Sequence, residues 1–255
     1  MPAKRHALSL LVVAGLVALL LLAARGSDPH AIDLLRALEP PSLAQPFGTD
    51  HLGRSIAVRL ADGLWRTLAV LFLLTAVAIP AGFALGFLAI FGSEAISRFA
   101  ICFARAGVAV PTFILALAAT AVFGLSPVSV GIAIGVAAAA QYTLLAAELG
   151  RTALKEHFVL ASVALGVSPV GIAIRHVLPT IAPVLRRHLS TDLARAVVAY
   201  AGLAFIGLGA DTGRSDWGAM AWEYRAWVFE APWLLFGPAA AVGVLAGGLS
   251  YAMDD

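Results

Sequence analysis

A series of long, almost uncharged apolar stretches limits the folds open to this chain. Each approaches the length of about 20 residues with which an α-helix crosses the hydrocarbon layer of a membrane. Because lipid offers the backbone no hydrogen bonds, stretches of this kind are expected to be helical. The six stretches are Leu8–Ala24, Leu68–Phe91, Phe99–Phe123 (interrupted by Pro111), Val128–Ala147, Leu193–Leu208 and Trp233–Tyr251. The sequence therefore predicts an all-α polytopic membrane protein with about six transmembrane helices.

The composition agrees with a membrane protein and argues against two other classes. Hydrophobic residues make up 61% of the chain and charged residues 13%, and the mean hydropathy is +0.92, a balance typical of helices packed in lipid. A formal net charge of +2 is too small and too dispersed for a nucleic-acid-binding protein. The single cysteine, Cys102, excludes a disulfide framework and a thiolate metal site.

The order of the stretches predicts a topology of three parts. Residues 1–25 hold a cytoplasmic N-terminus and a retained first transmembrane helix, because Lys4 and Arg5 precede the first stretch. This stretch is long for a signal peptide and has no convincing Ala-x-Ala cleavage site. Residues 26–66 are expected to form an extracytoplasmic loop ending in an interfacial amphipathic helix, with Asp50 as its polar cap. Residues 67–255 form the core, in which residues 151–183 return to the cytoplasm.

The polar interruption at residues 151–183 has a helical pattern of its own. Its first apolar residues recur at helical spacing, namely Leu154, Phe158, Ala161 and Leu165. Gly166 is placed to end this helix, and Ser168 and Pro169 are placed to cap and begin a second one. Leu178 and Pro179 are expected to end the second helix. The pattern predicts a compact helix–turn–helix, a shape suited to a groove on a partner protein.

The sequence lacks the common motifs that carry chemistry. A P-loop needs a lysine after glycine, and the only lysines, Lys4 and Lys155, follow alanine and leucine. No His-x-x-x-His, Cys-x-x-Cys or Gly-x-Ser-x-Gly pattern occurs, and the six histidines are dispersed over predicted loops. We therefore expect no catalytic residue, no metal site and no bound cofactor, and no enzymatic activity of this chain.

The spacing within residues 160–179 resembles the cytoplasmic EAA loop of ABC importer permeases, on which the ATPase subunit docks in that family. Ala161, Gly166 and the Leu178–Pro179 pair stand at the matching offsets, whereas Leu160, Ser162 and His176 replace the family's Glu, Ala and Ile. Leu160 keeps the helix packing but puts a charge contact at this position in doubt. The resemblance implies an ATPase-coupling site made of Leu160, Ala161, Ser162, Leu165, Gly166, Ser168, Pro169, Leu178 and Pro179.

A second set of motifs resembles permeases of the dipeptide, oligopeptide and nickel family. GTDHLGR (residues 48–54) is similar to the signature before the family's second span, although Ser55 stands where most relatives carry Asp. Residues 205–209 and 216–218 resemble two later elements, and the landmarks follow the family order from about residue 30 onward. The signature residues are Gly48, Thr49, Asp50, Gly53, Arg54, Gly207, Gly209, Trp217 and Gly218.

The resemblance implies the second, C-type permease subunit of an ATP-driven importer in the bacterial inner membrane. Its implied partners are a second homologous permease, two cytoplasmic ATPases that hold ATP and Mg²⁺, an extracytoplasmic substrate-binding protein and the lipid bilayer, with no nucleic acid. The implied substrate is nickel, a metal chelate or a di- or oligopeptide, and the string DHLGR looks slightly closer to the nickel type.

Two alternatives stay open at this point. A secondary transporter driven by an ion gradient calls for a paired charge at mid-membrane and for repeated halves, and the sequence shows neither. A non-transporting membrane anchor has no need of the helix–turn–helix at residues 151–183.

A few residues stand out inside the predicted spans. Pro111, Gln141 and Tyr142 are expected to line a transport pathway. Gly82-x-x-x-Gly86 and Gly131-x-x-x-Gly135 favour close helix packing. Charged residues lie near the predicted span ends, where snorkelling or pairing accounts for them without a transport role; they are Arg105, Glu148, Asp192 and Arg195.

Overall fold

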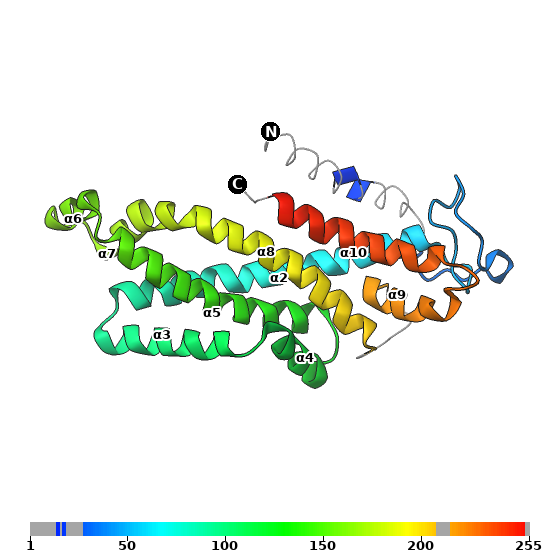
Figure 1. Ribbon diagram of the computed structural model, residues 1–255, viewed down its shortest axis with the longest axis horizontal. Helices are drawn as coiled ribbons and strands as arrows, with labels where there is room; N and C mark the ends of the chain where they lie inside the picture. Colours follow the sequence, from blue (N-terminus) through cyan, green and yellow to red (C-terminus); the bar gives the residue numbers. More distant parts are fainter. Residues whose placement is uncertain (1–13, 16, 19–27, 208–214, 253–255) are drawn as a thin grey trace.

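The computed structural model describes residues 14–15, 17–18, 28–207 and 215–252. These residues form an elongated bundle, with a loop region at one end and a small helical projection at the other (Figure 1). The helical elements, with η for 3₁₀- or π-helical turns, are η1 (Leu34–Arg36), α2 (Ile56–Phe91), α3 (Glu94–Ala109), α4 (Thr112–Phe123), α5 (Pro127–Ala153), α6 (His157–Ala164), α7 (Pro169–Ile172), η2 (Ala173–Val177), α8 (Leu178–Phe205), α9 (Trp217–Tyr224), η3 (Arg225–Trp227) and α10 (Trp233–Ala252). Within the described residues, the extended structure is one isolated bridge between Thr49 and Ser55, so the predicted all-α class is confirmed.

The structure places the six predicted spans differently. Helices α2, α5 and α10 are long and apolar enough to cross a membrane, and they contain the second, fourth and sixth stretches. The third stretch is broken, because α3 and α4 are bent by 82° at Pro111, whose ring disfavours a helical conformation of the preceding residue. The fifth stretch lies in α8 as far as Phe205, and its last residue, Leu208, is outside the described residues. Helix α8 is too polar to count among the three spanning helices. The first stretch lies outside the described residues, apart from residues 14–15 and 17–18.

Close contact between α2 and α5 forms the centre of the bundle. A Cβ atom at Gly131 would lie 3.0 Å from the carbonyl oxygen of Val70, and one at Gly135 would lie 3.0 Å from that of Leu74. Gly82 of α2 faces α5 in the same way, 2.7 Å from the Cβ of Tyr142. Small residues let the two backbones approach each other, so the packing predicted from both Gly-x-x-x-Gly patterns is confirmed.

The predicted interfacial helix after GTDHLGR does not exist as a separate element. Residues from Ile56 onward are the first turns of α2, and Ile56, Arg59 and Leu60 are each 0% exposed. The amphipathic pattern was misleading because the charge of Arg59 is compensated by groups inside the protein and is not solvated by water. Ser55, and not Asp50, is the N-cap residue of this helix. The boundary predicted between residues 66 and 67 therefore falls inside α2.

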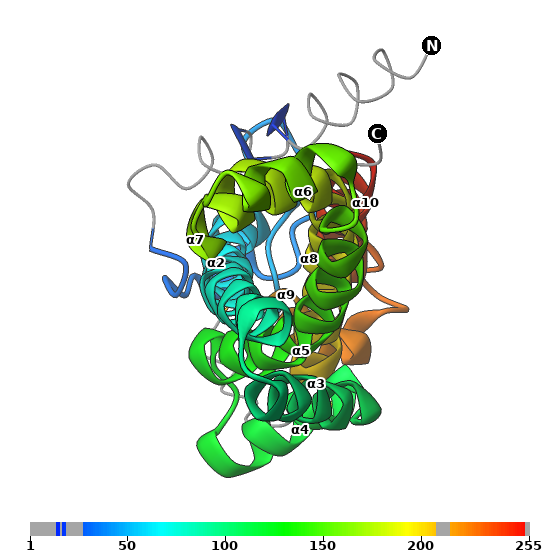
Figure 2. The same cartoon turned by 90° about the vertical axis from the view of Figure 1, so that its left-hand side faces the viewer.

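At the opposite end, α6 and α7 project from the bundle, and we call this pair, His157–Ile172, the knob (Figure 1). Figure 2 views the molecule from this end, with α6 and α7 along one side and α3 and α4 along the other. Gly166 has a φ of +79°, the left-handed conformation of a helix-ending glycine. Ser168 accepts a hydrogen bond from the amide of Gly171 at the start of α7. Both features agree with the pattern predicted for this turn.

The predicted end of the second helix at Leu178–Pro179 is wrong. The chain continues from α7 through the π-helical turn η2 directly into α8. Pro179 occupies the second position of α8, next to the wider turn. A π-helical turn changes the local hydrogen-bond ladder, and the proline, which has no amide hydrogen to donate, is accommodated there. The knob is thus joined to α8 by unbroken helical backbone.

Candidate functional site

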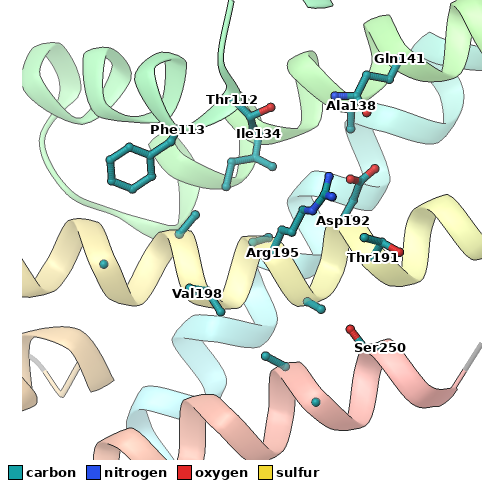
Figure 3. A pocket seen from close by; sticks show the side chains of 16 residues that line it. Thr112, Phe113, Ile134, Ala138, Gln141, Thr191, Asp192, Arg195, Val198 and Ser250 are labelled. Carbon is teal, nitrogen blue, oxygen red and sulfur yellow. The ribbon is translucent and has the colours of Figure 1, made fainter.

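A cavity of about 790 Å³ opens between α5 and α8, with residues of α4 and α10 at its sides (Figure 3). Its wall is mainly apolar and includes Phe113, Ile134 and Val198. The largest polar side chains in the wall are Gln141, Asp192 and Arg195. A mainly apolar cavity with a few convergent polar groups is the usual form of a small-molecule site.

The carboxylate of Asp192 is held in place from α5. The hydroxyl of Tyr142, a residue that is 2% exposed, donates a hydrogen bond to Asp192 Oδ2 at 3.0 Å. Arg195 follows three residues later on α8 and is exposed. Figure 3 shows both charged side chains extending from α8 toward α5.

The predicted pathway residues gather around this cavity to different degrees. Gln141 lines it, and Tyr142 contacts a lining residue. Pro111 is not itself in the wall but precedes Thr112 and Phe113, which are. Their role in transport stays a prediction.

Asp192 and Arg195 were not expected in a cavity. The sequence pattern starts a span at Leu193, whereas α8 begins at Leu178, so both charges lie in the middle of a long helix. Their spacing of three residues, which places them on one helical face, was the signal available in the sequence.

The knob presents an exposed apolar surface. Five of its side chains are each more than half exposed, namely Phe158, Leu160, Val163, Leu165 and Val170. Beneath them, Val159 and Ile172 are buried in one cluster and hold α6 against α7. Ser162 Oγ lies 3.1 Å from His176 Nε2 and links α6 to η2. The knob is therefore a folded unit with an apolar exterior.

The structure brings the predicted coupling residues onto the knob or beside it. Leu160, Ala161, Leu165, Gly166, Ser168 and Pro169 are exposed, and Ser162 is partly buried. Leu178 and Pro179 lie just beyond, at the start of α8. The apolar face expected from the periodicity is not buried, because Phe158 and Leu165 point outward and Val159 takes the buried position. A surface formed in this way is available to a partner.

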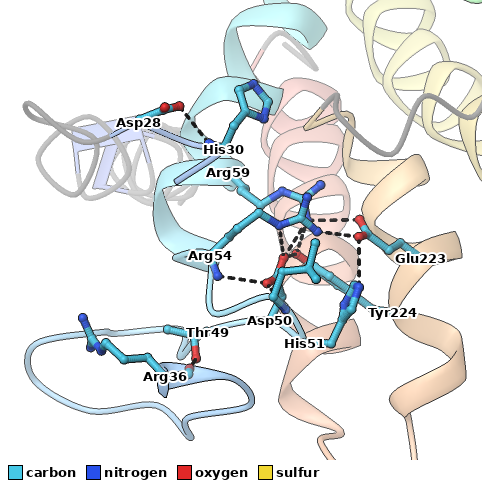
Figure 4. A network of polar contacts seen from close by, with 11 residues as sticks. Asp28, His30, Arg36, Thr49, Asp50, His51, Arg54, Arg59, Glu223 and Tyr224 are labelled. Atoms are coloured by element: carbon cyan, nitrogen blue, oxygen red, sulfur yellow. Dashed lines mark hydrogen bonds and ion pairs between the residues drawn. The ribbon is translucent and has the colours of Figure 1, made fainter. Parts of the chain in front are cut away.

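A buried network of charges closes the other end of the molecule, the loop end, which comprises residues 28–55 and 215–232 (Figure 4). Asp50 accepts hydrogen bonds from Arg54 Nε at 2.7 Å and from Arg59 Nη1 at 2.8 Å. Arg59 also donates to Glu223 at 3.0 Å and to Tyr224 at 2.8 Å. Burial alone would raise the pKa of the Asp50 carboxyl, but Arg54 and Arg59 outweigh it and hold that pKa below its usual value. The network ties residues 50–59 to α9.

A second set of contacts joins the loop end to α2 and α8. Asp216 accepts a hydrogen bond from Arg66 Nε at 2.6 Å, and the indole of Trp217 donates to the carbonyl oxygen of Leu60 at 2.9 Å. A Cβ atom at Gly218 would lie 1.9 Å from the carbonyl oxygen of Ala201, so a larger residue does not fit without a backbone shift.

These contacts unite signature residues that are far apart in the sequence. Gly48, Thr49, Asp50, Gly53 and Arg54 lie against the start of α2, and Trp217 and Gly218 meet α2 and α8 from the other side of the same end. Gly207, with a φ of +82°, follows the end of α8. Gly209 lies outside the described residues.

Sequence reasoning did not identify Glu223 and Tyr224 as partners of Arg59. The available signal was Arg59 itself, an arginine between Val58 and Leu60 in an apolar turn. A buried cation requires a paired and hydrogen-bonded anion, so an acidic residue of another loop had to meet it.

Asp50, His51 and Glu223 also place three donor atoms within 4.8 Å of one another. Both carboxylates already accept hydrogen bonds from arginines. A cation would have to compete with two guanidinium groups there. We therefore assign no metal to this cluster.

The arrangement defines a class of protein. Two apolar helices of spanning length, α5 and α10, line a cavity with polar groups in its wall. Helix α8 also lines that cavity and continues into the exposed apolar knob. These features are those of an integral membrane component of a transport system that works with further subunits.

Comparison with known proteins identifies the family. Residues 78–253 match the family described as the binding-protein-dependent transport system inner membrane component, and the chain belongs to that family. The probable D,D-dipeptide transport system permease protein DdpC of Escherichia coli K12 is 31% identical over 228 residues, which cover 89% of this chain and 76% of that protein. The nickel transport system permease protein NikC of the same organism is 30% identical over 239 residues, covering 91% and 85%. The probable peptide ABC transporter permease protein y4tQ of Sinorhizobium fredii is 31% identical over 253 residues, covering 97% and 87%.

A solved structure supports the fold. A chain from the inward-facing MetNI methionine ABC transporter has a TM-score of 0.57 at 20% sequence identity, covering 77% of this chain and 93% of that chain. The protein is thus a permease subunit of an ABC importer, located in the bacterial inner membrane.

Proposed function

We propose that this permease forms half of a translocation pathway for nickel, a metal chelate or a di- or oligopeptide. The other half would be a second homologous permease, and a substrate-binding protein would deliver the solute from outside. The substrate range follows from relatives whose names specify D,D-dipeptides, nickel and peptides. Two ATPase subunits, which hold ATP and Mg²⁺, would bind the knob from the cytoplasm.

The exposed apolar surface of the knob is the observation that carries the proposal. Phe158, Leu160, Val163 and Leu165 lie on a short helix that is already folded against α7. Exposed apolar side chains gathered on one short projecting helix mark a candidate protein-binding site. The short α6 helix also offers a compact shape to a groove of the ATPase.

The charge distribution supports a cytoplasmic location of the knob. Arg151, Lys155 and Arg175 lie in or beside it, and Arg186 and Arg187 follow in the first half of α8. Basic residues near the ends of transmembrane segments favour the cytoplasmic side. With this orientation, the loop end faces the binding protein.

The helical connection between the knob and α8 supports a coupling mechanism. Closure of the ATPases on ATP would shift the knob, and the unbroken backbone through η2 would carry this shift to the cavity-lining part of α8. The permease would then exchange an outward-open for an inward-open state, each stabilised by a different state of the ATPases.

A charge placed on the knob surface tests the proposal. We expect Leu165→Asp to insert normally, since Leu165 is 85% exposed and lies at the end of α6 in the knob, but to lose the ATPases during purification and to lose ATP-driven uptake. Leu35→Asp is the matched control for copurification, because Leu35 is 98% exposed at the loop end. Retention of the ATPases by Leu165→Asp would contradict docking at the knob.

A further inference from the structure

The cavity wall carries a carboxylate, Asp192, and a guanidinium group, Arg195, that are not hydrogen-bonded to each other. Asp192 and Arg195 are separated by one step of three residues, about 4.5 Å along the axis of α8. Both line the cavity. Within the part of the chain that the structure describes, Arg195 forms neither a hydrogen bond nor an ion pair. The two opposite charges attract each other at this spacing without a direct contact, so hydrogen-bonding positions on both groups remain open to a ligand.

We propose that Asp192 and Arg195 form a binding site for a small zwitterion with apolar side chains, of the chemical class of a dipeptide. The α-ammonium group of the ligand would bind Asp192, and its α-carboxylate would bind Arg195. This inference deepens the proposed function and rests on it, because the site would lie on the translocation pathway.

The carboxylate of Asp192 is prepared for a cation. Tyr142 holds one of its oxygens from the side of α5 at 3.0 Å, which fixes the side chain. An ionised carboxylate has about four acceptor positions, so the Tyr142 hydroxyl leaves positions open for an ammonium group.

The guanidinium of Arg195 is suited to the other end of the ligand. Its planar fork binds a carboxylate through two parallel hydrogen bonds. The two ends of an extended dipeptide are about 7 Å apart at most. Two side chains that leave the same helical face one turn apart can span this distance.

The remaining wall fits the middle of such a ligand. Phe113, Ile134 and Val198 supply apolar surface, and Gln141 offers an amide to a peptide group. The cavity volume of about 790 Å³ lies in the range of about 300–1,000 Å³ that is usual for small-molecule sites. Each apolar side chain of the ligand that leaves water would add to the binding free energy.

The same geometry disfavours a bare divalent cation. The cavity offers one carboxylate, and the positive charge of Arg195 lies one turn away. Among the described residues, the group of three metal donors is Asp50, His51 and Glu223 at the loop end, and none of them lines the cavity. The site therefore favours the peptide side of the proposed substrate range.

Binding to the assembled transporter tests the site. The permease, purified with its ATPases in lipid nanodiscs and without binding protein, would be titrated by calorimetry with alanyl-phenylalanine, its N-acetyl derivative, its C-terminal amide and NiCl₂. We expect the free dipeptide to bind at least about tenfold more tightly than either blocked form, as is usual for the loss of a charged hydrogen bond.

The two conservative variants should respond differently to the blocked ligands. Asp192→Asn should weaken binding of the dipeptide and of the amide by about tenfold and leave the N-acetyl form unchanged. Arg195→Gln should weaken the dipeptide and the N-acetyl form and leave the amide unchanged. Glu148→Gln and Arg187→Gln are matched controls, because both residues are exposed and outside the cavity.

Each other outcome overturns a defined claim. Equal binding of all three peptides, equal weakening of all three in both variants, or nickel binding that Asp192→Asn abolishes would overturn the zwitterion site. The ATPases should copurify and hydrolyse ATP in every variant. A wild-type knob that binds no ATPase would instead overturn the proposed function, whatever the peptides do.

Discussion

The two ends of this permease differ in the kind of side chain that they bury and the kind that they expose. At the loop end, charged side chains are buried: Asp50 and Arg59 are 0% exposed and form an ion pair. At the knob, apolar side chains are exposed: Leu165 is 85% exposed. Each end thus departs from the usual arrangement, in which charged side chains are exposed and large apolar side chains are buried.

The difference distinguishes a buried charge network that holds the fold together from an exposed apolar surface that a partner could cover. A buried ion pair must remain closed, since opening it leaves a charge without water or partner. An exposed apolar surface has the opposite property, because it becomes more stable when a partner covers it. Substitutions in the buried charge network of the loop end should therefore affect folding, and those on the exposed surface of the knob should affect assembly.

The largest effect is expected from Arg59→Met, which leaves Asp50 and Glu223 buried with less positive charge. Removal of one partner from a buried pair costs about 3–5 kcal/mol, and we expect this loss in the free energy of unfolding, measured by denaturant titration in detergent. Arg98→Met is the control, because its pair with Glu94 is exposed and contributes at most about 1 kcal/mol. Similar losses in both variants would remove the distinction between buried and exposed pairs.

A somewhat smaller effect is expected from Asp50→Asn, and it should depend on pH. The pKa of Asp50 is lower in the fold than in the unfolded chain. Its stabilising contribution is therefore complete above the unfolded value of about 3.9 and is lost as the pH falls through the folded value. At pH 7 we expect Asp50→Asn to be less stable by about 1.5–3 kcal/mol. The gap between the two unfolding curves should narrow below pH 4, and a gap that widens with acid would contradict this account.

Gly166→Val should separate strain from docking at the knob. Gly166 and Gly124 have φ values of +79° and +77°, and neither has a neighbour within 4 Å of an added Cβ atom. Valine at either position should cost about 1–3 kcal/mol of backbone strain. Only Gly166→Val should also lose the ATPases and vesicle uptake, because Gly124 lies between α4 and α5 and outside the knob. Loss of both functions in Gly124→Val as well would attribute them to strain alone.

The smallest effect on stability is expected from Leu160→Glu, which restores the acid of the EAA pattern. Leu160 is more than half exposed, so the free energy of unfolding should change by less than about 0.5 kcal/mol. If apolar contact dominates docking, ATPase copurification should fall, as for Leu165→Asp. A large gain would show that a charge contact is important at this position and would weaken the comparison drawn above.

Features that depend on neighbouring residues were predicted well. Gly166 and Ser168 form the turn that their chemistry demands, and the glycines of α2 and α5 meet as their spacing indicates. In each case the cause lies within a few residues or in a simple repeat.

Features that depend on distant partners were not predictable in the same way. Arg59 looked like an interfacial residue because nothing near it in the sequence announces Glu223, which follows 164 residues later. Asp192 looked like the end of a span because the length of α8 depends on η2, which lets helical backbone continue past Pro179. The cavity requires α4, α5, α8 and α10 together, and no single stretch contains that information.

The continuous path from α7 into α8 has a mechanical consequence. At the loop end, the hydroxyl of Tyr200 in α8 donates a hydrogen bond to Asp216. This contact would be the pivot about which α8 turns. Asp192 lies eight residues from it, about 12 Å, whereas Leu178, the first residue of α8, lies 22 residues away, about 33 Å. A helix that swings about this contact acts as a lever with a ratio of about three to one. A large movement of the ATPases at its far end would produce a smaller displacement, with a greater force, at the cavity.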